Sequence, residues 1–277
     1  MAEPRTIVIT GASSGIGLAA AEQLAAGGDR VVLVGRDERR LAIAVDRVRA
    51  AGRGAEPGRF QADFERLADV RALADHLLAT YPRIDVLANN AGMTTMSHRR
   101  TVDGHEATIQ ANHLGPFLLS KLLRERLRGS RIVNTSVRPG PNVRLDPDRL
   151  DRDGRRYNGI AAYQTSKAAN VLFAMEAARR WPDILSLSLH PGLARTDIGR
   201  DTALRFFFRY APFLAGPEKS ARRLVRLATA PADELTSGAL HGPGDPIRPN
   251  PRVFNADNAA RLWATSEAAV AGPATQP

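Results

Sequence analysis

The chain has 277 residues, of which 43% are hydrophobic and 25% are charged, as in ordinary soluble globular proteins. Its formal net charge is +10, but its lysines and arginines are spread along the chain, aromatic residues make up only 5%, and no recognition module is present. These features argue against a nucleic-acid-binding protein and favour a solvated, arginine-rich surface, which could equally attract an anionic, phosphate-bearing cofactor. The absence of cysteine excludes disulfides, thiolate metal sites and cysteine nucleophiles, and we predict no metal in the site.

The N-terminal segment MAEPRTIVIT enters a short apolar run at once and lacks the pattern of a signal peptide, so we expect a cytoplasmic protein. The most apolar later stretch, residues 203–216, is interrupted by Arg205, Arg209 and Pro212 and is too short to span a bilayer. Contact of this stretch with a membrane surface stays open.

Short β-rich runs alternate with longer amphipathic segments over the first two thirds of the chain. The predicted strands cover residues 6–10, 30–34, 59–62, 84–88, 131–135 and 184–189. The predicted helices cover residues 15–26, 38–51, 67–80, 103–127 and 162–180. Apolar strands separated by helices indicate a parallel sheet that is covered on both faces. The sequence therefore predicts an α/β fold of the Rossmann type, a doubly wound parallel sheet in a single domain that spans residues 1–277.

Residues 201–271 break this alternation. We expect a substrate lid over about 201–216 and terminal helices after it, with a loop at 242–251 (GPGDPIRPNP) and a frayed tail at 272–277. The aromatic side chains of the lid, which include Phe206, Phe207 and Phe208, suggest a lipophilic substrate. They are equally compatible with a core or with the contact of a homo-oligomer.

The segment TGASSGIG follows the first predicted strand and opens the first predicted helix. Its glycines allow a sharp turn, a close approach of a ligand to the backbone, and close packing of the helix on the strand. The helix N-terminus then presents free N–H groups and a partial positive charge to a pyrophosphate. An ordinary tight turn is the alternative, but the strand–loop–helix context favours a dinucleotide site. The residues predicted to hold the dinucleotide here are Gly11, Ser13, Ser14, Gly15, Ile16 and Gly17.

The end of the second predicted strand, VVLVGRDERR, bears on which dinucleotide is bound. An acidic residue at this position hydrogen-bonds the ribose of NAD(H), whereas an arginine accommodates the 2′-phosphate of NADP(H). Arg36 follows the junction here, with Arg39 and Arg40 one turn later, so we predict NADP(H) rather than NAD(H). Asp37 is the counter-indication, and the alternative is that these arginines only decorate the start of a helix.

The segment AYQTSKAAN places Tyr163 and Lys167 four residues apart on a predicted helix, so that both side chains leave it on one face. An ammonium beside a phenol stabilises the phenolate and lowers the pKa of the phenol, as a general acid/base requires. Such a spacing alone is common on helix surfaces. The motifs around the pair are what indicate a catalytic role.

Those motifs are TGASSGIG, Asn89-Asn90-Ala91-Gly92 after the fourth strand, Asn112 in QANHLGPF, and His190-Pro191-Gly192 after the sixth strand. In this order they resemble the short-chain dehydrogenase/reductase family, over roughly residues 4–272. The stretches around NHLG, SKAANVLF and RLWATSE look like the branch that contains retinol dehydrogenases and WW-domain oxidoreductases.

The resemblance implies a role for each matching residue. Tyr163 would exchange a proton with the substrate oxygen, Lys167 would lower its pKa and hold the nicotinamide ribose, and Asn112 would help to place a water. Asp63 would meet the adenine, although it could instead cap the next helix, and Asn112 could be a structural amide. The remaining residues that would line the cofactor are Asn90, Ala91, Gly92, Pro191, Gly192 and Thr196.

The chain departs from the family pattern at the end of the fifth strand. Where the family reads approximately IVNVSS, with the second serine donating to the substrate carbonyl, this chain reads IVNTSV, so Val137 holds that position. Loss of one such donor typically costs 10²–10³ in rate. Three outcomes stay open: Ser136 takes over through a bulge or slip of one residue, Tyr163 and Lys167 sustain a reduced activity, or the protein binds NADP(H) without turnover.

We therefore predict an NADP(H)-dependent oxidoreductase that acts on a small-molecule carbonyl/alcohol pair, with Tyr163, Lys167, Asn112 and Ser136 as its catalytic candidates. The alternative is a catalytically impaired NADP(H)-binding sensor or interaction protein.

Overall fold

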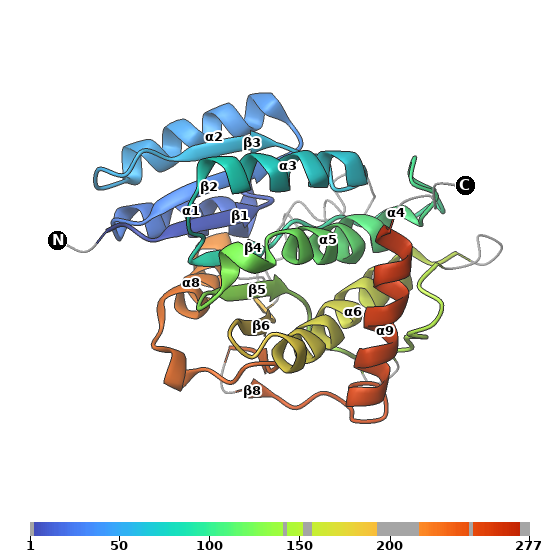
Figure 1. Ribbon diagram of the computed structural model, residues 1–277. Coiled ribbons are helices and arrows are strands. Elements are labelled where there is room, and N and C mark those ends of the chain that lie inside the picture. The colour runs from blue at the N-terminus through green and yellow to red at the C-terminus, as the bar shows by residue number, and fades with distance from the viewer. Residues whose placement is uncertain (1–2, 141–142, 152–156, 193–215, 244–245, 272–277) are drawn as a thin grey trace.

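The computed structural model describes residues 3–140, 143–151, 157–192, 216–243 and 246–271. Within these residues the strands form one eight-stranded sheet in the order β3-β2-β1-β4-β5-β6-β7-β8 (Figure 1). Every neighbouring pair is parallel except β7 and β8. The strands are β1 (Thr6–Thr10), β2 (Arg30–Gly35), β3 (Gly58–Gln61), β4 (Val86–Asn89), β5 (Arg131–Thr135), β6 (Leu185–Leu189), β7 (Leu240–His241) and β8 (Pro246–Ile247). The expected Rossmann-type α/β fold is confirmed.

Helices cover both faces of the sheet, as Figure 1 shows. One face carries α1 (Gly15–Ala26), α2 (Glu38–Ala51) and α8 (Pro217–Thr229), with α1 packed between the other two. The other face carries α3 (Leu67–Thr80), α5 (Gly115–Leu122), α6 (Gly159–Arg180) and α9 (Ala256–Val270). The apolar strands follow from this arrangement, because a strand covered on both faces has no side chain that points to water.

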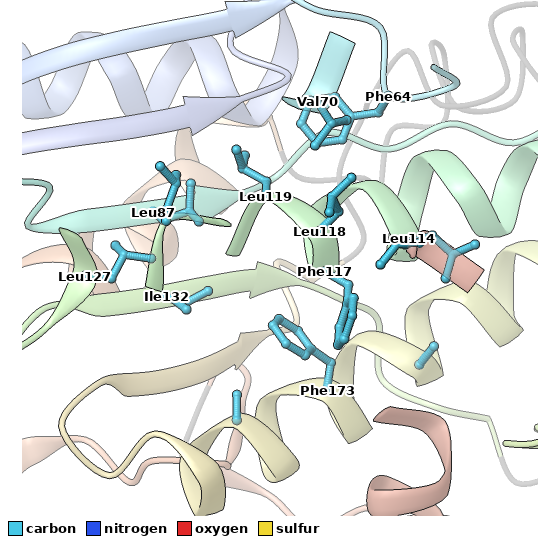
Figure 2. Close-up of a cluster of buried hydrophobic side chains, with 14 of the residues drawn as sticks. Phe64, Val70, Leu87, Leu114, Phe117, Leu118, Leu119, Leu127, Ile132 and Phe173 are labelled. Carbon is cyan, nitrogen blue, oxygen red and sulfur yellow. The ribbon is translucent and has the colours of Figure 1, made fainter. Parts of the chain in front are cut away.

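Two hydrophobic cores result from the alternation of side chains along each strand. Ile7 and Ile9 of β1 pack in the core beneath α1, α2 and α8, whereas Val8 between them packs in the opposite core. Figure 2 shows the second core, where Phe117 of α5 and Phe173 of α6 lie next to each other with ring centroids 5.5 Å apart. Such edge-on aromatic pairs add to the stabilisation that comes from burying apolar area.

The helix predicted over 103–127 is confirmed only in part, because helical backbone begins at Ala107 and is not α-helical throughout. It is divided into α4 (Ala107–Ile109), a π-helical turn (Gln110–Leu114), α5 and a 3-10 turn (Arg124–Leu127). The π-helical turn inserts extra backbone into the helix, a feature that occurs often at functional sites and that apolar periodicity does not reveal.

The loop expected at 242–251 is also partly wrong, because β8 lies inside it and pairs with β7. Both strands have two residues and are too short for a sequence pattern. Among the described helices, none is long and apolar enough to cross a bilayer.

The sheet order reverses at β1, which has β2 on one side and β4 on the other. At such a switch point the connections from neighbouring strands leave in opposite directions, which opens a crevice at the carboxyl ends of the strands. In this fold the crevice lies between the segments that follow β1 and β4.

Candidate active site

The loop between β1 and α1 has a backbone that only glycine adopts comfortably. Gly11 and Gly15 have φ angles of 67° and 57°, in the left-handed region. A Cβ on Gly11 would lie 2.8 Å from the Cα of Ala91, and one on Gly17 would lie 2.4 Å from the carbonyl oxygen of Gly11. The glycines therefore let the loop, the first helix and the segment after β4 pack closely, as the motif predicts.

Thr10 joins this loop to the segment after β4. Its hydroxyl oxygen accepts hydrogen bonds from the backbone N–H of Asn90 at 3.0 Å and of Ala91 at 2.9 Å. Asn90 in turn donates from its amide to the carbonyl of Thr10 at 3.1 Å and accepts from the hydroxyl of Thr135 at 3.3 Å. The ends of β1, β4 and β5 are thus held together by side chains, which makes the floor of the crevice rigid.

A cavity of about 1220 Å³ lies above this floor. It is lined by the glycine loop, by the ends of β2, β4, β5 and β6, and by the first turns of α6. Its volume exceeds that of a typical small-molecule pocket, so it has room for a dinucleotide together with a substrate.

One end of the cavity, beyond β2 and β3, carries exposed charges. The guanidinium of Arg36 lies 3.4 Å from a carboxylate oxygen of Glu65, and Arg99 donates to the other oxygen of the same carboxylate. This hydrogen bond raises the pKa of Arg99. Asp37 accepts from the backbone N–H of Arg40 and caps α2, so it has a local structural role.

The other end of the cavity holds Tyr163 and Lys167 of α6. The ammonium of Lys167 donates to the carbonyl of Thr135 at 3.1 Å and lies 5.7 Å from the ring centroid of Tyr163. Lys167 is only 1% exposed, and burial lowers its pKa to about 8. Burial raises the pKa of Tyr163, and this effect opposes the lowering that we predicted from the nearby Lys167 ammonium.

Ser136 and Val137 follow β5. The hydroxyl of Ser136 does not simply replace the one that Val137 lacks. The Ser136 hydroxyl is buried and donates to the backbone carbonyl of Lys167 at 2.6 Å. A serine has one hydroxyl hydrogen, so this bond removes Ser136 as a donor to a substrate. Val137 is partly exposed and lines the cavity. Ser136 also lines the cavity, but its one hydroxyl hydrogen is used in this bond, so the outcome in which Ser136 takes over from the missing serine is not supported.

Asn112 lies in the π-helical turn and is completely buried. Its amide oxygen accepts from the N–H of Met93 at 2.8 Å, and its amide group donates to the carbonyl of Met93 and to the hydroxyl of Ser166, both at 2.9 Å. Both amide hydrogens are therefore used within the protein. The geometry favours the structural alternative, in which Asn112 fastens the segment after β4 to α6.

Comparison with known proteins decides the family. The family model described as short chain dehydrogenase matches residues 5–146. The chain belongs to the short-chain dehydrogenase family. A Streptomyces protein described as a candidate daunorubicin C-13 ketoreductase is 50% identical over 266 residues, which cover 96% of this chain and 92% of that protein. Human retinol dehydrogenase 13 is 34% identical over 95% of this chain and 83% of its own length.

A solved structure shares the fold of this short-chain dehydrogenase. A crystal structure from Mycobacterium paratuberculosis has a TM-score of 0.79 and 32% identity, and the match covers 97% of this chain and 94% of that one. The presence of retinol dehydrogenases among the relatives confirms the branch that the finer motifs indicate. As a member of this family, the protein is an oxidoreductase.

Most of the predicted site residues of the short-chain dehydrogenase line the cavity. The lining includes Gly11, Ser13, Ser14, Gly15, Ile16, Arg36, Asp63, Asn90, Ala91, Gly92, Ser136, Tyr163, Lys167, Pro191 and Gly192. Gly17 and Asn112 lie behind the lining residues, where Gly17 packs α1 on its loop. Asp63 does not cap α3; its carboxylate accepts from the N–H of Glu65 at 3.0 Å. Thr196 and residues 201–215 of the predicted lid fall outside the described residues.

Sequence reasoning missed Thr10, Glu65 and Arg99. Thr10 belongs to a strand and carries no motif of its own, and Glu65 and Arg99 meet only in the folded chain, 34 residues apart in sequence. The one signal for Thr10 was its place at the strand end just before the first glycine.

Proposed function

We propose that this short-chain dehydrogenase transfers a hydride between NADP(H) and the carbonyl or alcohol carbon of a lipophilic substrate. The observation that carries this proposal is a single cavity that joins the glycine loop, Arg36 and the pair Tyr163 and Lys167. Bound NADP(H) supplies or accepts the hydride. The chain's own residues bind it, orient it and move the accompanying proton.

The fit of a dinucleotide rests on a tightly packed floor and an open glycine loop. A Cβ on Gly92 would lie 3.1 Å from the ammonium of Lys167, and one on Gly11 would collide with Ala91, so the floor packs closely. A Cβ on Gly15 would meet no protein atom within 4 Å, so the loop leaves room for a pyrophosphate there. Ser13, Ser14 and the first N–H groups of α1 would receive the phosphates, and Asp63 would face the adenine.

Tyr163 is the proton donor in our proposal. In the reducing direction its hydroxyl gives a proton to the substrate oxygen while hydride arrives at the substrate carbon, and in the oxidising direction the phenolate takes the proton back. Burial raises its pKa and so keeps the hydroxyl protonated before the reaction, and the phenolate that forms on proton transfer needs a nearby positive charge. Lys167 supplies positive charge near the phenolate and is held for this purpose by the carbonyl of Thr135.

Arg36 and Arg40 line the end of the cavity where the 2′-phosphate of NADP(H) would lie. A phosphate binds guanidinium groups through charge-assisted hydrogen bonds that the ribose hydroxyl of NAD(H) does not match. The exposed side chain of Arg36 can exchange its carboxylate partner for the phosphate. This supports a preference for NADP(H).

The cavity lining also includes apolar side chains, beside polar ones such as Thr94, Gln164 and Arg138. Met93, Met96, Val137 and Ile160 line the cavity, and Met96 and Ile160 are about half exposed, at 48% and 50%. Exposed apolar side chains at a cavity mouth favour a lipophilic substrate. The name of the Streptomyces relative, which is 50% identical to this chain, makes a daunorubicin-like ketone the first candidate substrate, and retinol is the second.

The non-catalytic alternative rests only on Val137. The relatives compared are named as a ketoreductase and as dehydrogenases, which gives that alternative no support. We expect a working enzyme whose substrate carbonyl is polarised less strongly than in family members that have the serine.

Fluorescence titration with NADPH and NADH tests the cofactor, and we expect at least tenfold tighter binding of NADPH. Equal affinities would contradict the role of Arg36.

Reduction of a panel of daunorubicin, retinal and small hydrophilic ketones tests the chemistry, with Tyr163→Phe as the control. We expect turnover of the lipophilic ketones and at least a 100-fold lower kcat in the variant. Unchanged turnover in Tyr163→Phe would exclude the proton transfer that we assign to it.

A further inference from the structure

A chain of buried hydrogen-bonding side chains runs from the C-terminal helix α9 to the active site. The hydroxyl of Ser266 lies 2.9 Å from Nε2 of His113, and Nδ1 of His113 lies 3.2 Å from the amide oxygen of Asn170. The amide nitrogen of Asn170 donates to the carbonyl of Asn112 at 3.0 Å and to that of Thr135 at 3.3 Å. The Thr135 carbonyl also accepts from the ammonium of Lys167.

In this series of hydrogen bonds, each side chain donates to the next group nearer the active site. Because the nitrogen of the Asn170 amide faces two carbonyls, its oxygen must face His113, and Nδ1 of His113 must carry a proton to donate to it. Burial lowers the pKa of His113 to about 4, so the ring is neutral and Nε2 has no proton. The Ser266 hydroxyl then donates to Nε2 rather than to the carbonyl of Leu262, which lies 2.8 Å away. This tautomer is assigned from the hydrogen-bond network.

The three side chains come from the three stretches that set this branch apart in the sequence. His113 belongs to NHLG, Asn170 to SKAANVLF and Ser266 to RLWATSE. None of these side chains lines the cavity. Each is at most 1% exposed, and buried polar groups of this kind are costly unless all of their hydrogen bonds are made.

Lys167 depends on this arrangement for its position. Its ammonium has four rotatable bonds behind it, and among the hydrogen bonds of the described residues its one acceptor is the Thr135 carbonyl. Asn170 donates to the same carbonyl and to the carbonyl of Asn112 in the π-helical turn, so it links β5 to that turn at the acceptor of the ammonium.

We propose that His113 and Asn170 are positioning residues through which α9 fixes the place of the Lys167 ammonium in the active site. The proposal rests on the proposed function in one respect, since it takes Lys167 to act in the hydride-transfer reaction. It makes the C-terminal helix a working part of the catalytic site, although no residue of α9 lines the cavity.

Steady-state kinetics on matched variants tests the proposal. His113→Asn keeps a donor near the position of Nδ1, whereas His113→Leu has similar bulk and no donor, and both lose the bond to Ser266. We expect kcat to fall about tenfold in His113→Leu and less than threefold in His113→Asn, with KM for NADPH within twofold in both. His105→Leu is the control, because His105 also contacts α9, through the carbonyl of Ala269 at 3.0 Å, but has no link to Lys167. We expect its kcat to stay unchanged.

Equal kcat values for the two His113 variants, or an equal loss in His105→Leu, would overturn the proposal and leave His113 with a structural role only. If His113→Leu does not fold, Ser266→Ala takes its place. We expect a two- to threefold fall in kcat for it with KM unchanged, and no fall would count against the chain of bonds.

A second measurement separates this proposal from the proposed function. The chain has three lysines, at positions 121, 167 and 219, so the side-chain signals of ¹³C-lysine-labelled protein can be assigned one by one by NMR. The Lys167 signal should shift in His113→Leu and stay in place in His105→Leu. A shift in a protein that reduces no carbonyl would reject the proposed function and keep the positioning role, whereas no shift would reject the positioning role.

Discussion

The two ends of the cavity use polar side chains in opposite ways. At the end of the cavity beyond β2 and β3, called the adenine end after our proposal, Arg36 and Arg99 share one carboxylate. Both side chains are about half exposed, at 55% and 48%. At the catalytic end, Lys167 is 1% exposed and donates to a backbone carbonyl, and no carboxylate of the described residues pairs with it. Water screens the first set of charges and leaves the second set unscreened.

The exposed charges suit the recognition of a ligand, whereas the buried ammonium suits a role that needs a fixed position. Exposed ion pairs contribute little to stability and exchange partners readily, which suits a region that must release one anion to accept another. A buried amine with few partners is destabilising, but its position and its pKa are set by the fold. The adenine end should therefore tolerate substitution with changes in affinity only, whereas substitutions at the catalytic end should change rate and stability in opposite directions.

Lys167→Met should produce the largest effect. We expect kcat to fall by at least 100-fold, since the phenolate of Tyr163 loses its nearby positive charge. The free energy of unfolding at pH 7 should rise by about 2 kcal/mol, because a pKa lowered from 10.5 to about 8 costs about 3 kcal/mol and the lost hydrogen bond offsets about 1. Urea unfolding measures the change, and Lys219→Met on the exposed start of α8 is the control.

The pH dependence of the unfolding free energy tests whether the buried charge of Lys167 is destabilising. Between pH 8 and pH 10.5 the unfolded chain keeps a proton on Lys167 that the folded protein has lost, so stability should rise with pH across this window. The rise should disappear in Lys167→Met. If the difference in unfolding free energy between the wild type and Lys167→Met does not change with pH over that range, the lysine is not desolvated in the folded protein.

Val137→Ser should raise kcat about tenfold. A hydroxyl at this position of the cavity wall adds a donor to the substrate carbonyl, and a full gain of 10²–10³ is not expected from a site that has not adjusted to it. Val137→Ala removes the same methyl groups without adding a donor and should leave kcat within twofold. If both variants gain equally, space rather than hydrogen bonding limits the reaction.

Arg36→Ala should weaken NADPH binding about tenfold and leave NADH binding unchanged, since one exposed charge-assisted hydrogen bond is worth about 1.4 kcal/mol. Raising the salt concentration should narrow the difference between wild type and variant, because the contact is open to screening. Calorimetric titration at two ionic strengths measures both effects. Weakening of both cofactors to the same degree would place Arg36 away from the 2′-phosphate.

Glu65→Gln should have the smallest effect, a roughly threefold tighter binding of NADPH. The substitution removes the carboxylate that pairs with Arg36 and that would repel a phosphate. Glu38→Gln is the matched control, because Glu38 pairs with Arg59 outside the cavity. Weaker binding in Glu65→Gln would mean that Glu65 orients Arg36 for the phosphate instead of competing with it.

Much of the fold was predictable because local signals agree with the tertiary structure. The helices predicted at 15–26, 38–51 and 67–80 have the observed bounds, since glycines, caps and apolar periodicity all mark their ends or faces. The π-helical turn around Asn112 was not predictable. The extra backbone is held by contacts of Asn112 with Met93 and Ser166, which lie far away in sequence.

The sequence by itself determined the order of the first six strands and the helices between them, the glycine loop, the pair Tyr163 and Lys167, and the absence of a hydroxyl at Val137. These features reside in short stretches, where residue type and spacing decide the outcome. Only the tertiary structure decided that Ser136 is bound to the carbonyl of Lys167 and that His113, Asn170 and Ser266 form one chain of donors. The physical reason is that a polar side chain is free or satisfied according to partners that folding brings to it.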